Sequence, residues 1–380
     1  MYIDLTEEQH ALRARLRTYL AEVLPPAERA ILLRERHGVV YRELIRRLGR
    51  DGWLGLGFPT RFGGGGLGPV EQQIFVNEAA RADVPLPAVT LQTVAPTLLA
   101  HGSPEQQEFF LPRILTGELH FAIGYTEPEA GTDLAALRTR AVRDGDAYVV
   151  DGQKTFTTGA HAADYLWLAC RTDPGAPRHH GLSILIVDTK DPGYSWTPII
   201  TCDGAHHVNT VYLTGVRVPV ARRVGAENDG WRLLTTQLNH ERVMLGPAGR
   251  LGAVGERVHD WAYSRSLLEA PDVRRVLARV AACQRINELL NWSATGDEPN
   301  AADASVTKVF SSEWLLRLSQ ELEEVVWRRG DPADPATAEL LTWLDVQVKR
   351  NLVLTFGGGV NEIQRELIAS AGLGLPRVPR

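Results

Sequence analysis

The sequence predicts an α+β protein in which a helical part is followed by a β-rich part and then by a second helical part. Apolar residues recur at helical spacing up to about residue 120, short β-branched and aromatic runs follow to about residue 226, and helical spacing returns after Gly230. We therefore expect an N-terminal α domain over 1–120, a central antiparallel β domain over 121–226 and a C-terminal α domain over 227–380.

The first part contains several predicted helices. Thr6 and Gln9 form a capping box at the start of TEEQHALRARLRTYLAEVL, which ends at two prolines. Helical spacing recurs in VYRELIRRLGRDGWLGLG, PVEQQIFVNEAARA, AVTLQTVAPTLLAHG and PEQQEFFLPRILTG. The glycines of FGGGGLGP match the dinucleotide pattern GxGxxG, but no buried strand precedes them and Pro69 follows. We interpret this run as a turn between helices.

The central part reads as strands without intervening helices. HFAIGYT, DGDAYVVDGQKTF, DYLWLACRT, GLSILIVDT and NTVYLTGVRVPV are punctuated by Asp-Gly, Asn and Pro. This pattern favours an antiparallel sheet or barrel over a parallel nucleotide-binding sheet. After Gly230 helical periodicity runs to the end, with polar breaks at SATGDEPNAAD and DPADPATAE.

Composition narrows the function classes. The 380 residues are 44% hydrophobic and 23% charged with a net charge of −5, which disfavours disorder, nucleic-acid binding and a polybasic membrane anchor. Three cysteines far apart form neither a disulfide framework nor a paired zinc motif, and the histidines of TCDGAHHVN predict no metal site, because adjacent strand residues point to opposite faces. Without an apolar leader or an 18-residue apolar stretch, we expect a cytoplasmic protein with small-molecule and protein partners.

Glu241 occupies a position in an apolar stripe. Trp231, Leu234, Leu238, Leu245 and Ala248 fall on the same helical face as this carboxylate. An interior carboxylate must be paired, protonated or facing a ligand cavity, and desolvation raises its pKa toward the range useful to a general base. A buried ion pair with an arginine is the alternative interpretation.

Two further segments indicate a polar ligand site. YTEPEAGTDL has turns built on Pro128 and Gly131 at a strand exit, where Thr126, Thr132 and backbone N–H groups could receive a ligand. About 25 residues later, QKTFTTGA ends another strand with an aromatic residue between threonines, which could provide a flat apolar wall and a hydroxyl donor.

Together these segments resemble the acyl-CoA dehydrogenase family of flavoproteins, and the resemblance spans nearly the whole chain. It rests on GFPTRFGGGG, YTEPEAGTD, GQKTFTTG, VRVP and NEIQRE, in the family's order. The resemblance implies the family's fold, with a C-terminal four-helix bundle, and its cofactor, FAD. The sequence is most similar in appearance to actinobacterial steroid side-chain acyl-CoA dehydrogenases, whose members form heterotetramers of two unlike chains.

The resemblance also implies roles for residues of the flavin signature. Tyr125 and Thr126 resemble residues that touch the flavin pyrimidine edge. Thr132 resembles the hydroxyl residue near the phosphate and the pantetheine of the substrate, and Gly131 beside it belongs to the same cofactor-binding loop.

The second motif and the helix after the β part carry the remaining implied roles. Phe156 stands where a tryptophan often packs on the isoalloxazine ring, and Thr158 resembles the hydroxyl that bonds N5. Arg242 resembles a residue near the bound thioester. In many members the catalytic base is the Glu of Tyr-Glu-Gly-Thr, but Gly358 stands at that position. The family's other location for the base is a Glu-Arg pair, here Glu241-Arg242.

A second departure concerns the half of the flavin site that homotetrameric relatives take from a neighbouring subunit. Their Arg-x-x-Phe-Gly segment is absent, because SLLEAPDVRR follows WAYSR, and WRRGDPADPATAELL replaces a Gln-x-x-Gly-Gly-x-Gly loop. We therefore expect an α2β2 complex with a second, related acyl-CoA dehydrogenase chain, which supplies the missing half-site.

The function that these features favour is α,β-dehydrogenation of an acyl-CoA thioester with a steroid-derived acyl group, as in cholesterol catabolism. Glu241 would be the base, and an electron-transfer flavoprotein would accept the electrons. Two alternatives stay open at this point. The chain could be a non-catalytic subunit that scaffolds an active partner, which Gly358 favours, or a flavin-dependent oxidase or monooxygenase.

Overall fold

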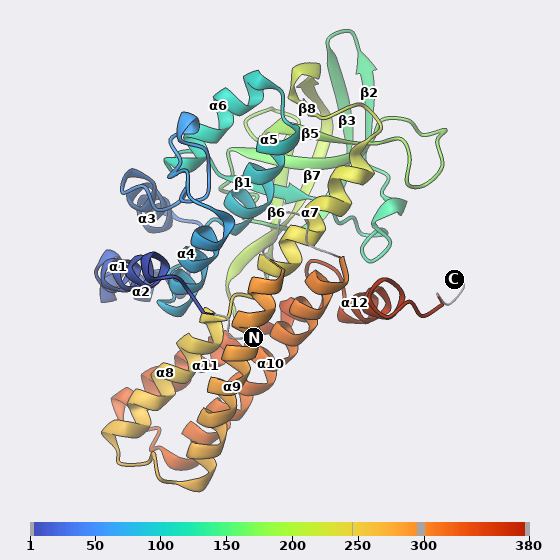
Figure 1. Ribbon diagram of the computed structural model, residues 1–380. Coiled ribbons are helices and arrows are strands. Elements are labelled where there is room, and N and C mark those ends of the chain that lie inside the picture. The colour runs from blue at the N-terminus through green and yellow to red at the C-terminus, as the bar shows by residue number, and fades with distance from the viewer. Residues whose placement is uncertain (1–3, 245, 295–300, 377–380) are drawn as a thin grey trace. The chain divides into compact units, whose positions relative to one another are not determined.

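The structure, a computed structural model shown in Figure 1, describes residues 4–244, 246–294 and 301–376, with the side chains at 239–244 left out of the description. Its Cα positions divide into two compact units. The helical unit consists of Met1–Leu33, Leu67–Leu86 and Asn239–Arg380, and the sheet unit consists of Arg34–Gly66 and Pro87–Leu238.

The succession of helices, strands and helices confirms the predicted α+β class. Helices in the described part of the chain are α1 Glu7–Val23, α2 Pro26–Leu32, α3 Val39–Arg50, α4 Pro69–Arg81, α5 Ala95–His101, α6 Pro104–Leu115, α7 Gly230–Met244, α8 Gly249–Ser264, α9 Pro271–Ser293, α10 Ala301–Arg329, α11 Pro335–Asn351 and α12 Asn361–Leu367. The strands are β1 Phe121–Gly124, β2 Arg140–Asp144, β3 Ala147–Thr158, β4 Tyr165–Arg171, β5 Leu182–Asp188, β6 Tyr194–Ile200, β7 His206–Pro219 and β8 Arg223–Val224.

The sheet unit is built on one eight-stranded sheet in the order β6-β7-β3-β2-β4-β5-β8, with β1 beside β4. Most pairings are antiparallel, but β1 runs parallel to β4 over four residue pairs, and β2 meets β4 in parallel at Arg140 and Arg171. The prediction of an antiparallel β domain was therefore wrong for these strands, and the sheet is mixed. The 40 or so residues between β1 and β4, which include the β2–β3 hairpin, are long enough to return the chain to the same end.

Buried residues on one face of this sheet make its core. Tyr148, Val150, Leu168, Val187 and Val211 belong to a cluster in which every member is almost fully buried. Strand β5 is buried at its first six positions, which explains its sequence LSILIV, apolar except for Ser183. The predicted Asp-Gly turn joins β2 to β3, where Gly145 adopts a φ of +63°.

In the helical unit, α8, α9, α10 and α11 form the four-helix bundle that the resemblance implied (Figure 1). Its core includes Val258, Val276, Leu318 and Leu344. At the N-terminus, Thr6 caps α1 with the predicted reciprocal bonds to Gln9. None of the helices in the described part of the chain is long and apolar enough to cross a membrane.

The cysteines, the possible metal ligands and the glycine run have simple structural surroundings. Cys170 and Cys283 are buried, Cys202 is exposed, and none of the three is in a disulfide. No group of three or more His, Cys, Asp or Glu side chains among the described residues is arranged to hold a metal ion. In the glycine run, a 3-10 turn over Thr60–Phe62 leads into Gly63 at a φ of +86°, with no strand before it, so the run is a turn.

Candidate functional site

The loop after β1 contains a tight turn whose polar groups form hydrogen bonds within the chain. Glu127 and Ala130 exchange two backbone hydrogen bonds, at 3.0 and 3.1 Å between N and O. Tyr125 is buried, and its hydroxyl donates to Gln237 Oε1 of α7. The ring of Tyr125 is thus held inside the sheet unit. Thr126 is half-buried, while Gly131 and Thr132 are exposed.

The end of β3 is bulged where the second motif lies. The register between β3 and β7 shifts between Lys154 and Thr157, and Phe156 takes a left-handed φ of +55°. This residue is 63% exposed. Thr158 is exposed and Thr157 is buried, so Phe156 and Thr158 both reach the surface. A bulky residue in the left-handed region costs free energy, and such strain is concentrated at functional sites.

A buried ion pair joins these two segments, and the sequence reasoning missed it. Lys154 is completely buried, and its Nζ donates to Glu127 Oε1 at 2.8 Å and to the Tyr125 carbonyl at 3.0 Å. The Glu127 carboxylate also accepts from the backbone N–H groups of Arg138 and Thr139, at 2.6 and 2.9 Å. The Thr155 N–H donates to the Thr126 carbonyl at 2.9 Å. The sequence contains one signal for this pair. YTEPEAGTD has a glutamate and GQKTFTTG has a lysine, two residues of opposite charge beside apolar neighbours.

Burial and the charge of the partner both shift the pKa values of Glu127 and Lys154. Burial alone raises the pKa of the Glu127 carboxyl, but the Lys154 ammonium and the two backbone donors outweigh it and hold the pKa below its ordinary value. Burial lowers the pKa of Lys154, against the opposing effect of Glu127. The pair therefore joins the loop after β1 to β3, while Phe156 and Thr158 are exposed on the other side of the strand.

Glu241 and Arg242 lie on α7, but their side chains fall outside the described residues, so their predicted roles stay predictions. The apolar stripe that suggested Glu241 can be followed on its first turns. Leu234 is buried, Trp231 and Leu238 are half-buried, and Gln237 is 1% exposed on the same side. The stripe does not continue to Ala248, because α7 ends at Met244 and Pro247 precedes the next helix.

Two segments of the helical unit bind each other, and in the sequence they replace the motifs that the resemblance assigns to a second flavin half-site. Arg265, at the end of α8, forms an ion pair with Asp334, whose carboxylate also caps α11 at Thr337 with a 3.0 Å bond. The guanidinium of Arg265 stacks 5.2 Å from the centre of the Trp261 ring. This arginine is therefore engaged by its own chain. Gly358, which the resemblance aligns with the family's usual base, has a φ of +67°.

Comparison with known protein families gives three matches that together span most of the chain. The family description "Acyl-CoA dehydrogenase, N-terminal domain" matches residues 6–118. The middle domain of the same family matches residues 122–218, and its C-terminal domain matches residues 228–373.

Individual relatives and solved structures agree with these matches. Acyl-CoA dehydrogenase FadE29 of Mycobacterium tuberculosis is 64% identical over 387 residues, covering 100% of both chains, and FadE26 of the same organism is 46% identical over 402 residues with the same coverage. The structure named Tcur3481-Tcur3483 steroid ACAD has a TM-score of 0.91 at 46% identity, and the ChsE4-ChsE5 complex from Mycobacterium tuberculosis has a TM-score of 0.90 at 45% identity. Each covers 100% of both chains.

Proposed function

This chain belongs to the acyl-CoA dehydrogenase family, whose members are FAD-dependent oxidoreductases, and from that premise we propose that it dehydrogenates an acyl-CoA thioester across its α,β bond. The observation that carries the proposal is the bulged end of β3, where an exposed aromatic ring and an exposed hydroxyl stand on a strained backbone. Such a surface is suited to a flat heteroaromatic ring that needs one hydrogen-bond donor.

The residues present fit FAD. Phe156 would pack on the isoalloxazine ring and Thr158 would bond its N5, while Tyr125 and Thr126 would lie at the pyrimidine edge, Tyr125 through its backbone because its hydroxyl is already bonded to Gln237. The exposed Gly131 and Thr132 would contact the cofactor, and Thr132 also the substrate's pantetheine. When bound, FAD accepts the substrate's β hydrogen as a hydride.

Glu241 is the proposed base for the α proton of the thioester. The family places its base either near the C-terminus, where this chain has Gly358, or in a Glu-Arg pair on the first long helix after the β part, which is α7. Arg242 would lie near the thioester of the bound substrate. A general base contributes about 10²–10⁴-fold to such a reaction.

We propose a steroid-derived acyl group as the substrate and a second acyl-CoA dehydrogenase chain as the partner. Two of the similar structures support this, since one is named a steroid ACAD and each is named for two chains. The Arg265–Asp334 pair also supports a partner. The FAD pyrophosphate needs fixed donors such as an arginine fork, and the arginine of this segment is already paired with a carboxylate.

Anaerobic titration of the assembly isolated from the native host, through a tag on this chain, tests the proposed function. A steroid side-chain acyl-CoA should bleach the flavin absorbance, and a straight-chain acyl-CoA of matched thioester chemistry should do so at least about tenfold more slowly. Equal rates would overturn the steroid assignment, and no bleaching by any acyl-CoA would overturn the activity. An electron-transfer flavoprotein should then reoxidise the flavin, whereas rapid oxygen consumption would identify an oxidase.

A further inference from the structure

The segment from Gly159 to Asp164 directly continues β3, which ends in Thr158, and side chains from several elements hold the backbone carbonyls of the strand end and of this segment. Asn209 of β7 donates to the Thr157 carbonyl at 3.2 Å, and the Tyr194 hydroxyl of β6 donates to the Ala160 carbonyl at 3.0 Å. Thr189, after β5, donates to the carbonyls of Ala163 and Asp164 at 2.8 and 3.0 Å. We call residues 159–164 the post-β3 loop.

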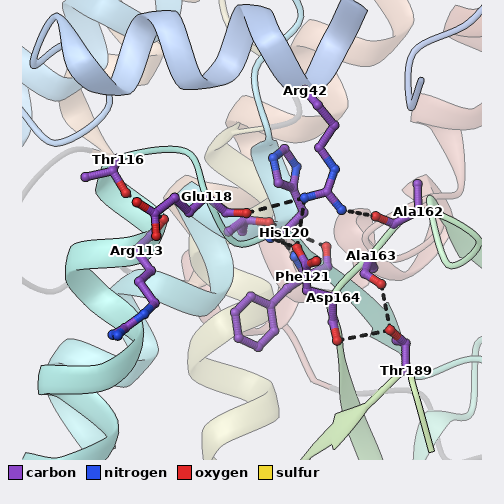
Figure 2. Close-up of polar contacts among 11 residues, drawn as sticks. Arg42, Arg113, Thr116, Glu118, His120, Phe121, Ala162, Ala163, Asp164 and Thr189 are labelled. Atoms are coloured by element: carbon purple, nitrogen blue, oxygen red, sulfur yellow. Dashed lines mark hydrogen bonds and ion pairs between the residues drawn. The ribbon is translucent and has the colours of Figure 1, made fainter. Parts of the chain in front are cut away.

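Arg42 of α3 adds the charged contacts to this loop (Figure 2). Its Nη1 lies 2.9 Å from Asp164 Oδ2, and its Nη2 donates to the Ala162 carbonyl. The same Asp164 oxygen accepts the backbone N–H of His120 at 2.8 Å, immediately before β1. One guanidinium and one carboxylate therefore connect α3, the start of β1 and the post-β3 loop. Their side chains are 19% and 28% exposed, so water screens this pair only partly.

His37, just before α3, supports the loop at a second point. A Cβ atom added at Gly159 would lie 2.9 Å from the His37 ring, and Gly159 has a φ of +67°. The ring of His37 also lies 5.3 Å from that of His161 and 6.1 Å from that of His207. A side chain at position 159 would therefore meet the His37 ring, in a left-handed backbone conformation that glycine adopts without strain, so the contact between His37 and the loop requires glycine there.

We propose that Arg42 is a positioning residue for the flavin site, because it fixes the post-β3 loop and through it the exposed Thr158 hydroxyl. Hydrogen bonds to a charged group are stronger than neutral ones, and a donor that is already oriented costs no reorganisation when a ligand binds. The proposal rests on the proposed function, since it assigns Thr158 to the flavin. It extends that function to a helix that carries no residue of the flavin motifs.

The test compares Arg42→Gln and Arg42→Lys with Arg46→Gln, a control at an exposed arginine one turn further along α3. Each variant is isolated as the native-host assembly. Hydrogen exchange is measured over residues 156–164, together with the flavin absorption spectrum and the rate of flavin reduction by saturating acyl-CoA. In Arg42→Gln, exchange in the loop should rise about tenfold or more. Its flavin spectrum should shift and its reduction rate should fall with KM nearly unchanged.

Arg42→Lys should give an intermediate result, because an ammonium can keep the charge pair with Asp164 but cannot also reach the Ala162 carbonyl. The control should match the wild type in every readout. Unchanged exchange in both Arg42 variants would overturn the proposal, and so would faster exchange with an unaltered spectrum and reduction rate. A wild-type assembly without flavin would instead overturn the proposed flavin site, while the exchange measurement, which needs no flavin, would still decide whether Arg42 holds the loop.

Discussion

At the scale of single residues, the complete burial of Lys154 is a feature that the fold shows and that the sequence did not predict. In GQKTFTTG, the sequence predicted a role for the aromatic ring and the hydroxyls, and the structure shows Phe156 and Thr158 exposed at the surface. The lysine of the same motif pairs with Glu127, 27 residues away. A sequence pattern indicates which face a residue occupies within one strand, but it does not indicate which distant charge meets it across the fold.

Removing one partner of this pair should be costly. Lys154→Met leaves the Glu127 carboxylate buried without its counter-ion, so the free energy of unfolding should fall by about 3–5 kcal/mol. The double variant Lys154→Met with Glu127→Gln should recover part of this loss, since no uncompensated charge remains. Lys190→Met, at an exposed lysine, is the matched control. Urea unfolding measures all three, and a Lys154→Met chain as stable as the control would mean that the pair is not buried as described.

Two adjacent threonines offer a test of the hydroxyl assigned to N5. Thr158 is exposed, whereas the buried Thr157 hydroxyl has no hydrogen-bond partner among the described residues. Thr158→Val should therefore change the reduction potential of the flavin or its visible spectrum, while Thr157→Val should be nearly neutral for both flavin and stability. Spectroelectrochemical titration distinguishes them. The opposite order, with only Thr157→Val altering the flavin, would place the ring on the other side of the strand.

At the scale of elements, the sequence predicted the blocks of helices and strands. It did not predict the bulge in β3, the parallel pairing of β1 or the end of α7. The capping box at Thr6 and the Asp-Gly hairpin are local signals, and the structure contains both. The bulge at Phe156 and the parallel pairing of β1 depend on a partner strand that local sequence does not specify. Helical periodicity likewise extended one stripe from Trp231 to Ala248, although α7 ends at Met244.

The histidines that pack around the post-β3 loop should make the sheet unit sensitive to acid. Burial, followed by neighbouring positive charge, lowers the pKa of His37 to about 3, and burial with Arg42 lowers that of His120 to about 4. Both rings are neutral in the folded chain, and in the unfolded chain they return to an ordinary pKa near 6.5. Their contribution to stability is therefore complete above pH 6.5 and is lost as pH falls toward 3–4.

Urea unfolding between pH 7 and pH 5 measures this dependence. Each histidine that takes up a proton on unfolding adds a slope of up to about 1.4 kcal/mol per pH unit in this window. His37→Phe keeps an aromatic ring but cannot bind a proton, so its stability should change less steeply with pH. His180→Phe, at an exposed position, is the matched control. Parallel curves for His37→Phe and the wild type would contradict the neutral, buried state of this ring.

At the scale of the whole molecule, the proposed complex should be visible in the flavin stoichiometry. The chain has the segments assigned to the flavin ring, whereas Arg265 binds Asp334 of its own chain in the segment where the resemblance implies a contribution to a neighbour's site. The chain expressed alone should thus hold little flavin, and co-expression with a related chain that has Arg-x-x-Phe-Gly should give one flavin per unlike pair, because a completed site stabilises the complex. A stable homotetramer with one FAD per subunit would refute this arrangement.

The role of Glu241 is tested most directly by anaerobic flavin reduction in a Glu241→Gln variant, isolated in its native assembly and mixed with saturating acyl-CoA. If this carboxylate removes the α proton, the variant should keep its flavin and its assembly while its reduction rate falls by at least about 10²-fold, since glutamine preserves the shape but cannot accept the proton. A reduction rate close to that of the wild type would contradict the assignment of Glu241 as the base and would leave catalysis to the partner chain.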